Sequence, residues 1–222
     1  MRVVLLTSDG TGRPDAVQVR RDYLKRAYRS WDAVDLTGVD FVELRDDQGW
    51  GIEQAGLHAI SHSLDGHEFG IVAFDDMLVA PDILDYFRWA EEVGRDDPNV
   101  VTIGAWTTSR PETTDTYYEV IKDQCYHCGV FGTWRDTWFD RMLPLYPPSV
   151  QGMRGVDQQF TDVIYPQEGW YELRPTWSRC QTIGAFGEHM RPGLMDAHTA
   201  RPWAAEAVPP EGIRPWHMRG DE

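Results

Sequence analysis

Residues 71–82 of this chain read IVAFDDMLVAPD, and this stretch decides the fold. An apolar run ends there on two neighbouring carboxylates, Asp75 and Asp76, and Pro81 with Asp82 begins the next segment. A run bounded in this way predicts a buried strand followed by the start of a helix. Carboxylates at the carboxyl end of such a strand reach the ligand-binding edge of an α/β sheet, where their hard oxygen atoms suit a divalent cation held against a phosphate.

The segments around this stretch alternate between strand and helix patterns. Strands are predicted at residues 3–7, 41–44, 69–74 and 99–105, and helices at about 15–31, 50–63 and 81–93. In the first helix, Tyr23, Ala27 and Trp31 recur on one face. Alternation of this kind predicts an α/β, Rossmann-like fold with a mostly parallel central sheet flanked by helices.

The second half of the chain is less regular. Short strands are predicted at residues 128–133 and 171–173, and a helix at 156–164. Near the end of the chain Pro, Arg and Trp are frequent and apolar periodicity is lost, so we predict an extended tail or lid over residues 202–222. Residues 1–201 are then predicted to form one domain with a regular half, 1–108, and an irregular half, 109–201.

Composition and charge exclude several classes of protein. The formal net charge of −15 disfavours a module that binds duplex nucleic acid. No apolar run approaches the ~18 residues of a membrane span, and the first strand reaches Asp9 too soon for a signal peptide. Three cysteines, Cys125, Cys128 and Cys180, are too few for a disulfide framework. We therefore expect a cytoplasmic protein without a membrane partner, while the oligomeric state is not predicted.

Several motifs in the same order resemble the N-acetylglucosaminyltransferase I family, glycosyltransferases of the GT-A fold. Residues 67–82 look like that family's Glu-Asp-Asp strand with its Ala-Pro-Asp ending. Residues 104–106, Gly-Ala-Trp, are similar to its Ser-Ala-Trp, and residues 174–179 to its Arg-Pro-x-x-Ser-Arg segment. The resemblance covers residues 3 to about 195. Phe74 departs from it, because the family has a glutamate there that would make a polar contact to the donor.

The resemblance implies an inverting, metal-dependent transfer of a sugar from a nucleotide diphosphate, with a UDP-sugar favoured and Mn²⁺ or Mg²⁺ as the cofactor. A cation that bridges the two phosphates would neutralise charge on the leaving group. Asp76 is the expected metal ligand of this DXD-like motif, and Asp75 would assist through water or a ribose hydroxyl. The competing explanation is that this acidic pair caps the following helix. Residues 1–108 would hold donor and metal, and 109–201 would shape the acceptor side.

Four further residues are candidates for the donor site. Arg20 begins a segment that resembles the Arg-Pro-Glu-Tyr-Leu helix start of many GT-A enzymes and would lie near the diphosphate, although a solvated helix arginine explains it equally well. Asp47 follows the second strand, where the fold presents an acid to the base or ribose, and an ordinary turn aspartate is the alternative. Arg179 would face the phosphates or else hold a turn. His189 would complete the metal shell or touch a phosphate.

An inverting reaction needs a base on the acceptor side. The resemblance places the family's Trp-Asp-Asp-Trp acid at Asp157, within Gly-Val-Asp-Gln-Gln-Phe, although the aromatic residue and the second acid are missing. Capping of a helix by Asp157 is the competing explanation. The acceptor would be a glycan, a protein, a small molecule or a hydroxylated nucleobase, and the protein would come from a bacterium or a virus.

The sequence is also compatible with two other functions, and it contains one cysteine–histidine motif. A nucleotidyltransferase also combines an α/β sheet with acidic metal ligands, and a sugar-binding module without catalysis would fit the ten tryptophans. The spacing of Cys125 and Cys128, with His127 between them, is zinc-like, but a structural zinc site needs four ligands and no second pair follows. We therefore interpret this motif as the buried entry to a strand.

Overall fold

The computed structural model describes residues 1–8, 17–47, 51–107, 116–127, 129–146, 156–184, 203–204 and 216–219, with backbone alone at 51–53 and 156. The elements in chain order are β1 (Arg2–Ser8), α1 (Val17–Trp31), β2 (Asp40–Asp46), α2 (Gly51–Ser63), β3 (Phe69–Phe74), β4 (Met77–Val79), α3 (Ile83–Gly94), β5 (Val100–Gly104), β6 (Glu119–Asp123), β7 (Val130–Trp134), η3 (Thr137–Met142), η4 (Leu143–Leu145), α4 (Val156–Gln159), η5 (Phe160–Ile164), α5 (Tyr165–Glu168), β8 (Tyr171–Pro175), β9 (Cys180–Thr182) and β10 (His217–Met218). Among these described elements, no helix has both the length and the apolar character that a membrane crossing requires.

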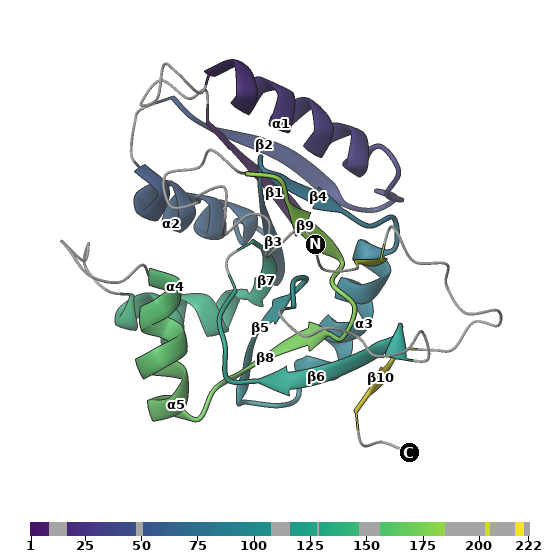
Figure 1. Cartoon of the computed structure of the whole chain (residues 1–222). Helices are drawn as coiled ribbons and strands as arrows, with labels where there is room; N and C mark the ends of the chain where they lie inside the picture. The colour runs from purple at the N-terminus through teal and green to yellow at the C-terminus, as the bar shows by residue number, and fades with distance from the viewer. Residues whose placement is uncertain are drawn as a thin grey trace.

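A single large sheet organises the molecule (Figure 1). Its strand order is β10-β6-β8-β5-β7-β3-β1-β2, and β4 pairs separately with β9. The β1–β2, β1–β3, β5–β8 and β6–β10 pairs are parallel, whereas β7 is antiparallel to both of its neighbours and β6 is antiparallel to β8. The α/β class predicted from the sequence is confirmed, with a mixed rather than nearly all-parallel sheet.

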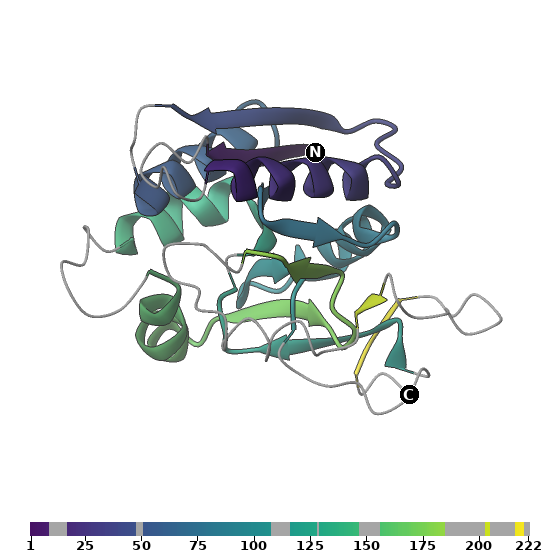
Figure 2. The same cartoon turned by 45° about the horizontal axis from the view of Figure 1, so that its top comes forward.

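Both faces of this sheet are covered, which explains why its central strands are continuous apolar runs. Successive residues of a strand point to opposite faces, so Val3 and Leu5 enter the core beneath α1 and α3, while Val4 and Leu6 enter the core beneath α2, η3 and η5. Figures 1 and 2 show α1 and α2 on either side of the β1–β2–β3 region. All four of these β1 side chains are buried.

The connections around β1 create a switch in strand order. The chain runs from β1 through α1 to β2 on one side, and then through α2 to β3 on the other side of β1. In α/β sheets, ligands bind outside the carboxyl ends of the strands at this kind of switch point. The acidic pair follows β3 directly, so the topology puts it at that position.

The chain forms short strands that sequence patterns did not predict, namely β4, β6, β9 and β10. Within residues 202–222, predicted as a tail or lid, the described residues pack against the rest of the domain. Trp203 and Ala204 are buried, β10 pairs with β6, and Trp216 lies against Tyr86 and Trp89. Apolar periodicity could not indicate this, since isolated tryptophans rather than a patterned face hold the segment in place.

Candidate functional site

The carboxyl ends of three parallel strands meet at one edge of the sheet. Ser8 at the end of β1 is in register with Asp46 of β2, and Leu6 is in register with Phe74, the last residue of β3. Only Asp75 and Asp76 separate β3 from β4. The sequence therefore folds here as predicted, with a strand that delivers two adjacent carboxylates to this edge.

The alternative role of the acidic pair, capping of the next helix, does not occur. β4 separates the pair from α3, which begins at Ile83 and has Asp82 as its N-cap residue. The pair lies instead in a tight strand-to-strand turn, in which the Asp75 amide donates to the Leu6 carbonyl at 3.1 Å.

Asp75 is held from two sides. The residue is only 4% exposed. Its Oδ2 atom accepts a hydrogen bond from the Ser8 amide at 3.0 Å, and its Oδ1 atom lies 3.6 Å from Nη2 of Arg20. Burial raises the pKa of Asp75, and the Ser8 amide and the Arg20 charge oppose that rise. Three elements, β1, α1 and β3, thus combine to orient one carboxylate.

Asp76 lies beneath the segment that follows β9. The Ile183 amide donates to the Asp76 carbonyl at 2.8 Å, and a Cβ atom added at Gly184 would overlap the Asp76 carboxylate. Burial and the neighbouring charge of Asp75 raise the pKa of Asp76 to about 6, while the charge of Arg20 lowers it. The carboxylate is therefore ionised at neutral pH and protonated in mild acid, and glycine is needed at position 184 to leave it room.

The carboxylates of Asp75 and Asp76 suit a divalent cation only when a bound ligand supplies further oxygen atoms. In the described part of the chain there is no cluster of three or more His, Cys, Asp or Glu side chains placed to hold a metal ion. Two carboxylates are nevertheless enough for Mg²⁺ or Mn²⁺ when phosphate oxygens and water complete the shell. The donor set at Asp75 and Asp76 fits that kind of shared site.

Asp47 and His189 are the other two residues predicted for the donor and metal site. Asp47 follows β2 directly and is exposed, at the same sheet edge as Ser8 because Ser8 is in register with Asp46. His189 lies outside the described residues, five positions after Gly184. Both assignments remain predictions.

Arg179 lies elsewhere, in the interior. Its residue is 0% exposed, and its three guanidinium nitrogens donate to the Asp82 carboxylate at 3.1 Å and to the carbonyls of Trp177 and Tyr117 at 2.6 Å each. The rings of Tyr117 and Trp216 lie 4.2 and 4.5 Å from its Cζ atom. Of the two alternatives given for Arg179, the geometry favours the residue that holds the fold, because each of its three guanidinium nitrogens donates to a group of the fold itself.

Asp157 is the second residue of α4 and is partly buried. It lies inside the first turn, where a carboxylate also favours the helix electrostatically. One turn further on, Thr161 contacts the segment before β7: its hydroxyl accepts from the Tyr126 amide at 3.0 Å and lies 3.8 Å from Sγ of Cys125. The helical segment that carries Asp157, α4 followed by η5, is thus fixed against the segment before β7.

Sequence reasoning missed two residues that shape the site. Ser8 contributes a backbone amide, which no side-chain motif reveals, and Gly184 is required by the position of the Asp76 carboxylate. The position of Gly184, five residues after the Arg-Pro-x-x-Ser-Arg segment, was the available signal for the second. Both become visible only when distant segments meet.

Comparisons with known proteins give weak structural likenesses but no match in sequence. No family model matches the chain, and no curated protein matches it. One of the similar solved structures is the crystal structure of a glycosyltransferase involved in the glycosylation of the major capsid of PBCV-1. The two sequences are 9% identical, the superposition covers 78% of this chain and 81% of the other, and the TM-score is 0.44. The function has to be inferred from the residues themselves.

Proposed function

We propose that this protein is a metal-dependent glycosyltransferase that moves a sugar from a nucleotide diphosphate, with a UDP-sugar favoured, to an acceptor hydroxyl with inversion. One observation carries the proposal. Arg20, Asp75 and Asp76 come together from α1 and from the end of β3, at the switch point where α/β sheets bind nucleotides.

The balance of charge at this point favours a cation between protein and donor. Among the described residues, two carboxylates, Asp75 and Asp76, face one guanidinium, Arg20, so this part of the site is net negative when ionised and would repel a bare diphosphate. A bound Mn²⁺ or Mg²⁺ would reverse that sign and neutralise the charge that builds on the leaving diphosphate. In this proposal Asp76 ligates the cation, Asp75 orients its water or a ribose hydroxyl, and Arg20 contacts the phosphates.

Asp157 is proposed as the base that takes the proton from the acceptor hydroxyl. Asp157→Asn should keep the donor affinity and lower turnover by about a hundredfold, because the amide cannot accept that proton. Turnover by single-turnover kinetics and donor affinity by calorimetry would test this. A variant with unchanged turnover would move the role to another residue.

The experiment that tests the class is a thermal-shift screen of nucleotide sugars with and without Mn²⁺. A ligand that binds only the folded chain raises its melting temperature, so the correct donor should stabilise the protein in the presence of Mn²⁺ and not in its absence. Released products then separate the functions: a glycosyltransferase releases nucleoside diphosphate, a nucleotidyltransferase releases pyrophosphate, and a sugar-binding module releases neither. Absence of any Mn²⁺-dependent shift would contradict the proposal.

A further inference from the structure

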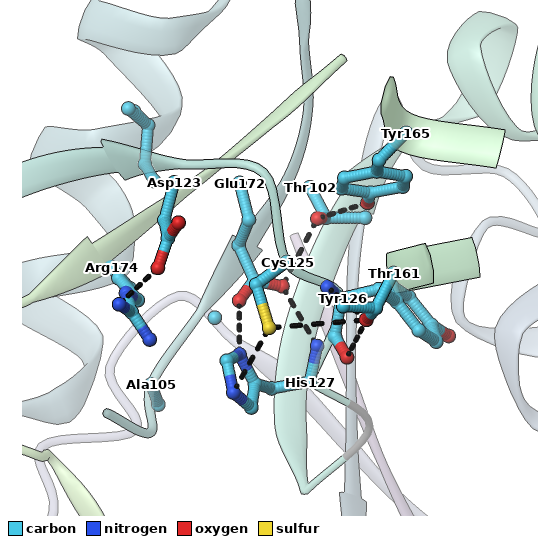
Figure 3. Close-up of polar contacts among 12 residues, drawn as sticks. Thr102, Ala105, Asp123, Cys125, Tyr126, His127, Thr161, Tyr165, Glu172 and Arg174 are labelled. Atoms are coloured by element: carbon cyan, nitrogen blue, oxygen red, sulfur yellow. Dashed lines mark hydrogen bonds and ion pairs between the residues drawn. The ribbon is translucent and has the colours of Figure 1, made fainter. Parts of the chain in front are cut away.

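A second group of ionisable side chains lies on the irregular half of the chain, in the segment between β6 and β7. Figure 3 shows the thiol of Cys125 and the carboxylate of Glu172 beside the imidazole ring of His127, and these three linked residues are called the row. Sγ of Cys125 lies 3.3 Å from Nε2 of His127, and Nδ1 of the same ring lies 3.0 Å from Oε1 of Glu172. The imidazole therefore bridges a thiol and a carboxylate through its two nitrogens.

Glu172 is a fully buried carboxylate, and its surroundings fix it. It comes from β8, and Oε2 accepts from Oγ1 of Thr102 at 3.1 Å and from the His127 amide at 3.3 Å. A Cβ atom at Gly104 would come within 2.5 Å of Oε1. Because an isolated buried carboxylate is costly, the side chain of His127 is the partner that offsets its charge.

The surroundings of His127 favour its protonated form. Burial alone would disfavour its charged form, but the hydrogen bonds to Cys125 and Glu172, together with the charge of Glu172, prevail and raise the pKa of His127 to about 9. The ring also meets the edge of Trp106, with centroids 5.0 Å apart. An imidazolium held in this way lies next to the sulfur atom of Cys125.

Other charged and titratable groups among the described residues near this row have partners of their own. Arg174, two residues beyond Glu172, forms an ion pair with Asp123. The hydroxyl of Tyr165 lies 2.7 Å from Oγ1 of Thr102, and that of Tyr86 donates to the carbonyls of Gly104 and Leu173. The row Cys125, His127 and Glu172 is thus a distinct unit, drawn from the β6–β7 segment and from β8.

We propose that Cys125 is a reactive thiol, activated by His127 and oriented through Glu172, which attacks hydroperoxides and becomes a sulfenic acid. The thiolate sulfur attacks one peroxide oxygen and the O–O bond breaks. The imidazolium gives its Nε2 proton to the departing oxygen, so hydrogen peroxide yields sulfenic acid, water and neutral imidazole. Sulfur loses two electrons, and the peroxide gains them.

The choice of electrophile follows from the neighbouring amides. Acyl transfer needs free N–H donors to stabilise an oxyanion. The amides of the two described residues that follow Cys125 are occupied, since that of Tyr126 donates to Oγ1 of Thr161 and that of His127 donates to Oε2 of Glu172. Attack on a peroxide needs no such hole, and a small oxidant suits a thiol that is only partly exposed.

Cys180 gives an internal reference. It is 1% exposed, and burial raises the pKa of its thiol, so it should stay protonated and unreactive in the folded chain. Both thiols sit in the same protein and meet the same oxidant. Their difference in reactivity therefore measures the effect of the surroundings.

The test uses the full chain with Cys128→Ser, so that Cys125 and Cys180 are the remaining thiols. Hydrogen peroxide is added with a cyclic 1,3-dione that traps sulfenic acid, and the adduct is located by mass spectrometry. At pH 6.5 we expect trapping at Cys125 and not at Cys180, with a rate that His127→Gln lowers by about tenfold or more, and a smaller difference at pH 9.5 where thiols ionise unaided.

His67→Gln is the matched control, because Nε2 of His67 also faces a carboxylate, Asp40 at 3.4 Å, but belongs to another part of the fold. It should leave the rate at Cys125 unchanged. Equal rates in the parent and in His127→Gln, or an adduct at Cys180, would overturn the proposal. If His127→Gln does not fold, the pH profile of the parent decides: a rate that rises only above pH 8 contradicts activation by His127.

Discussion

Two arginine–aspartate pairs, each with an arginine that the sequence assigned to the donor, have opposite surroundings. Arg20 lies 3.6 Å from Asp75 with 21% of its side chain exposed, whereas Arg179 lies 3.1 Å from Asp82 with none exposed. The first pair is at the carboxyl edge of the sheet. The second is enclosed between aromatic rings, with carbonyl groups on its remaining nitrogens.

The role of an ion pair therefore depends on its surroundings and not on its chemical type. A buried arginine with a hydrogen bond from each of its three nitrogens stabilises the segments that supply its partners, because removing it leaves a partly buried carboxylate and two carbonyls without their charged donor. A partly exposed arginine beside two acids still has donors for a ligand and adds little to stability. Three substitutions and a change of pH test this contrast between the two arginines.

The largest effect is expected from Arg179→Met. It should lower the free energy of unfolding by roughly 3–5 kcal/mol, because Asp82 and two carbonyls lose their charged partner. Denaturant unfolding would measure this, with Arg88→Met as the control, since Arg88 pairs with Asp85 at the surface and should cost less than about 1 kcal/mol. A stable Arg179→Met with weakened donor binding would instead restore the phosphate role.

Asp76→Asn should separate function from stability. The amide cannot supply an anionic ligand, so Mn²⁺-supported transfer should fall by about a hundredfold. The fold itself should keep or gain stability at pH 7.5, since the raised pKa of Asp76 means that its ionised form is disfavoured in the folded chain. Activity and melting temperature would be compared with those of Asp96→Asn, an exposed control. Loss of both together would argue for a structural role.

Arg20→Gln should weaken donor binding by about tenfold, the usual size of one charge-assisted contact. The melting temperature should change little, in contrast to Arg179→Met. Calorimetry with the donor and Mn²⁺ would measure the affinity, and Arg21→Gln on the same helix is the control. Unchanged affinity would favour the alternative of a merely solvated arginine.

The smallest effect concerns pH. Asp76 must lose its proton to bind a cation, so Mn²⁺ affinity should fall by about fourfold between pH 7 and pH 5.5, given a pKa of about 6. The pKa is raised, so the protonated form is the one that the fold favours, and stability should increase as pH falls from above 6 towards the ordinary value near 4. Arg20→Gln should move this transition to higher pH, because Arg20 lowers the pKa of Asp76.

The same contrast shows how far sequence patterns reach. The strands that became β1 and β3, and the acidic pair after β3, were predicted correctly because each depends on neighbouring residues and an apolar run. The short strands β6, β9 and β10 were missed, since a strand of two to five residues exists only through its partner. The row of Cys125, His127 and Glu172 was missed for a related reason: the carboxylate lies 45 residues away from the ring that it holds.

Three features could be derived from the sequence alone: the α/β class, the placement of Asp75 and Asp76 at a strand end, and the helix that carries Arg20. Local propensity and burial set each of them. Only the tertiary structure decided that Arg20 meets Asp75 while Arg179 is enclosed, and that Gly184 must leave space for Asp76. The physical reason is that a side chain's charge and donors are fixed by its chemistry, whereas its solvation and its partners depend on segments that are distant along the chain.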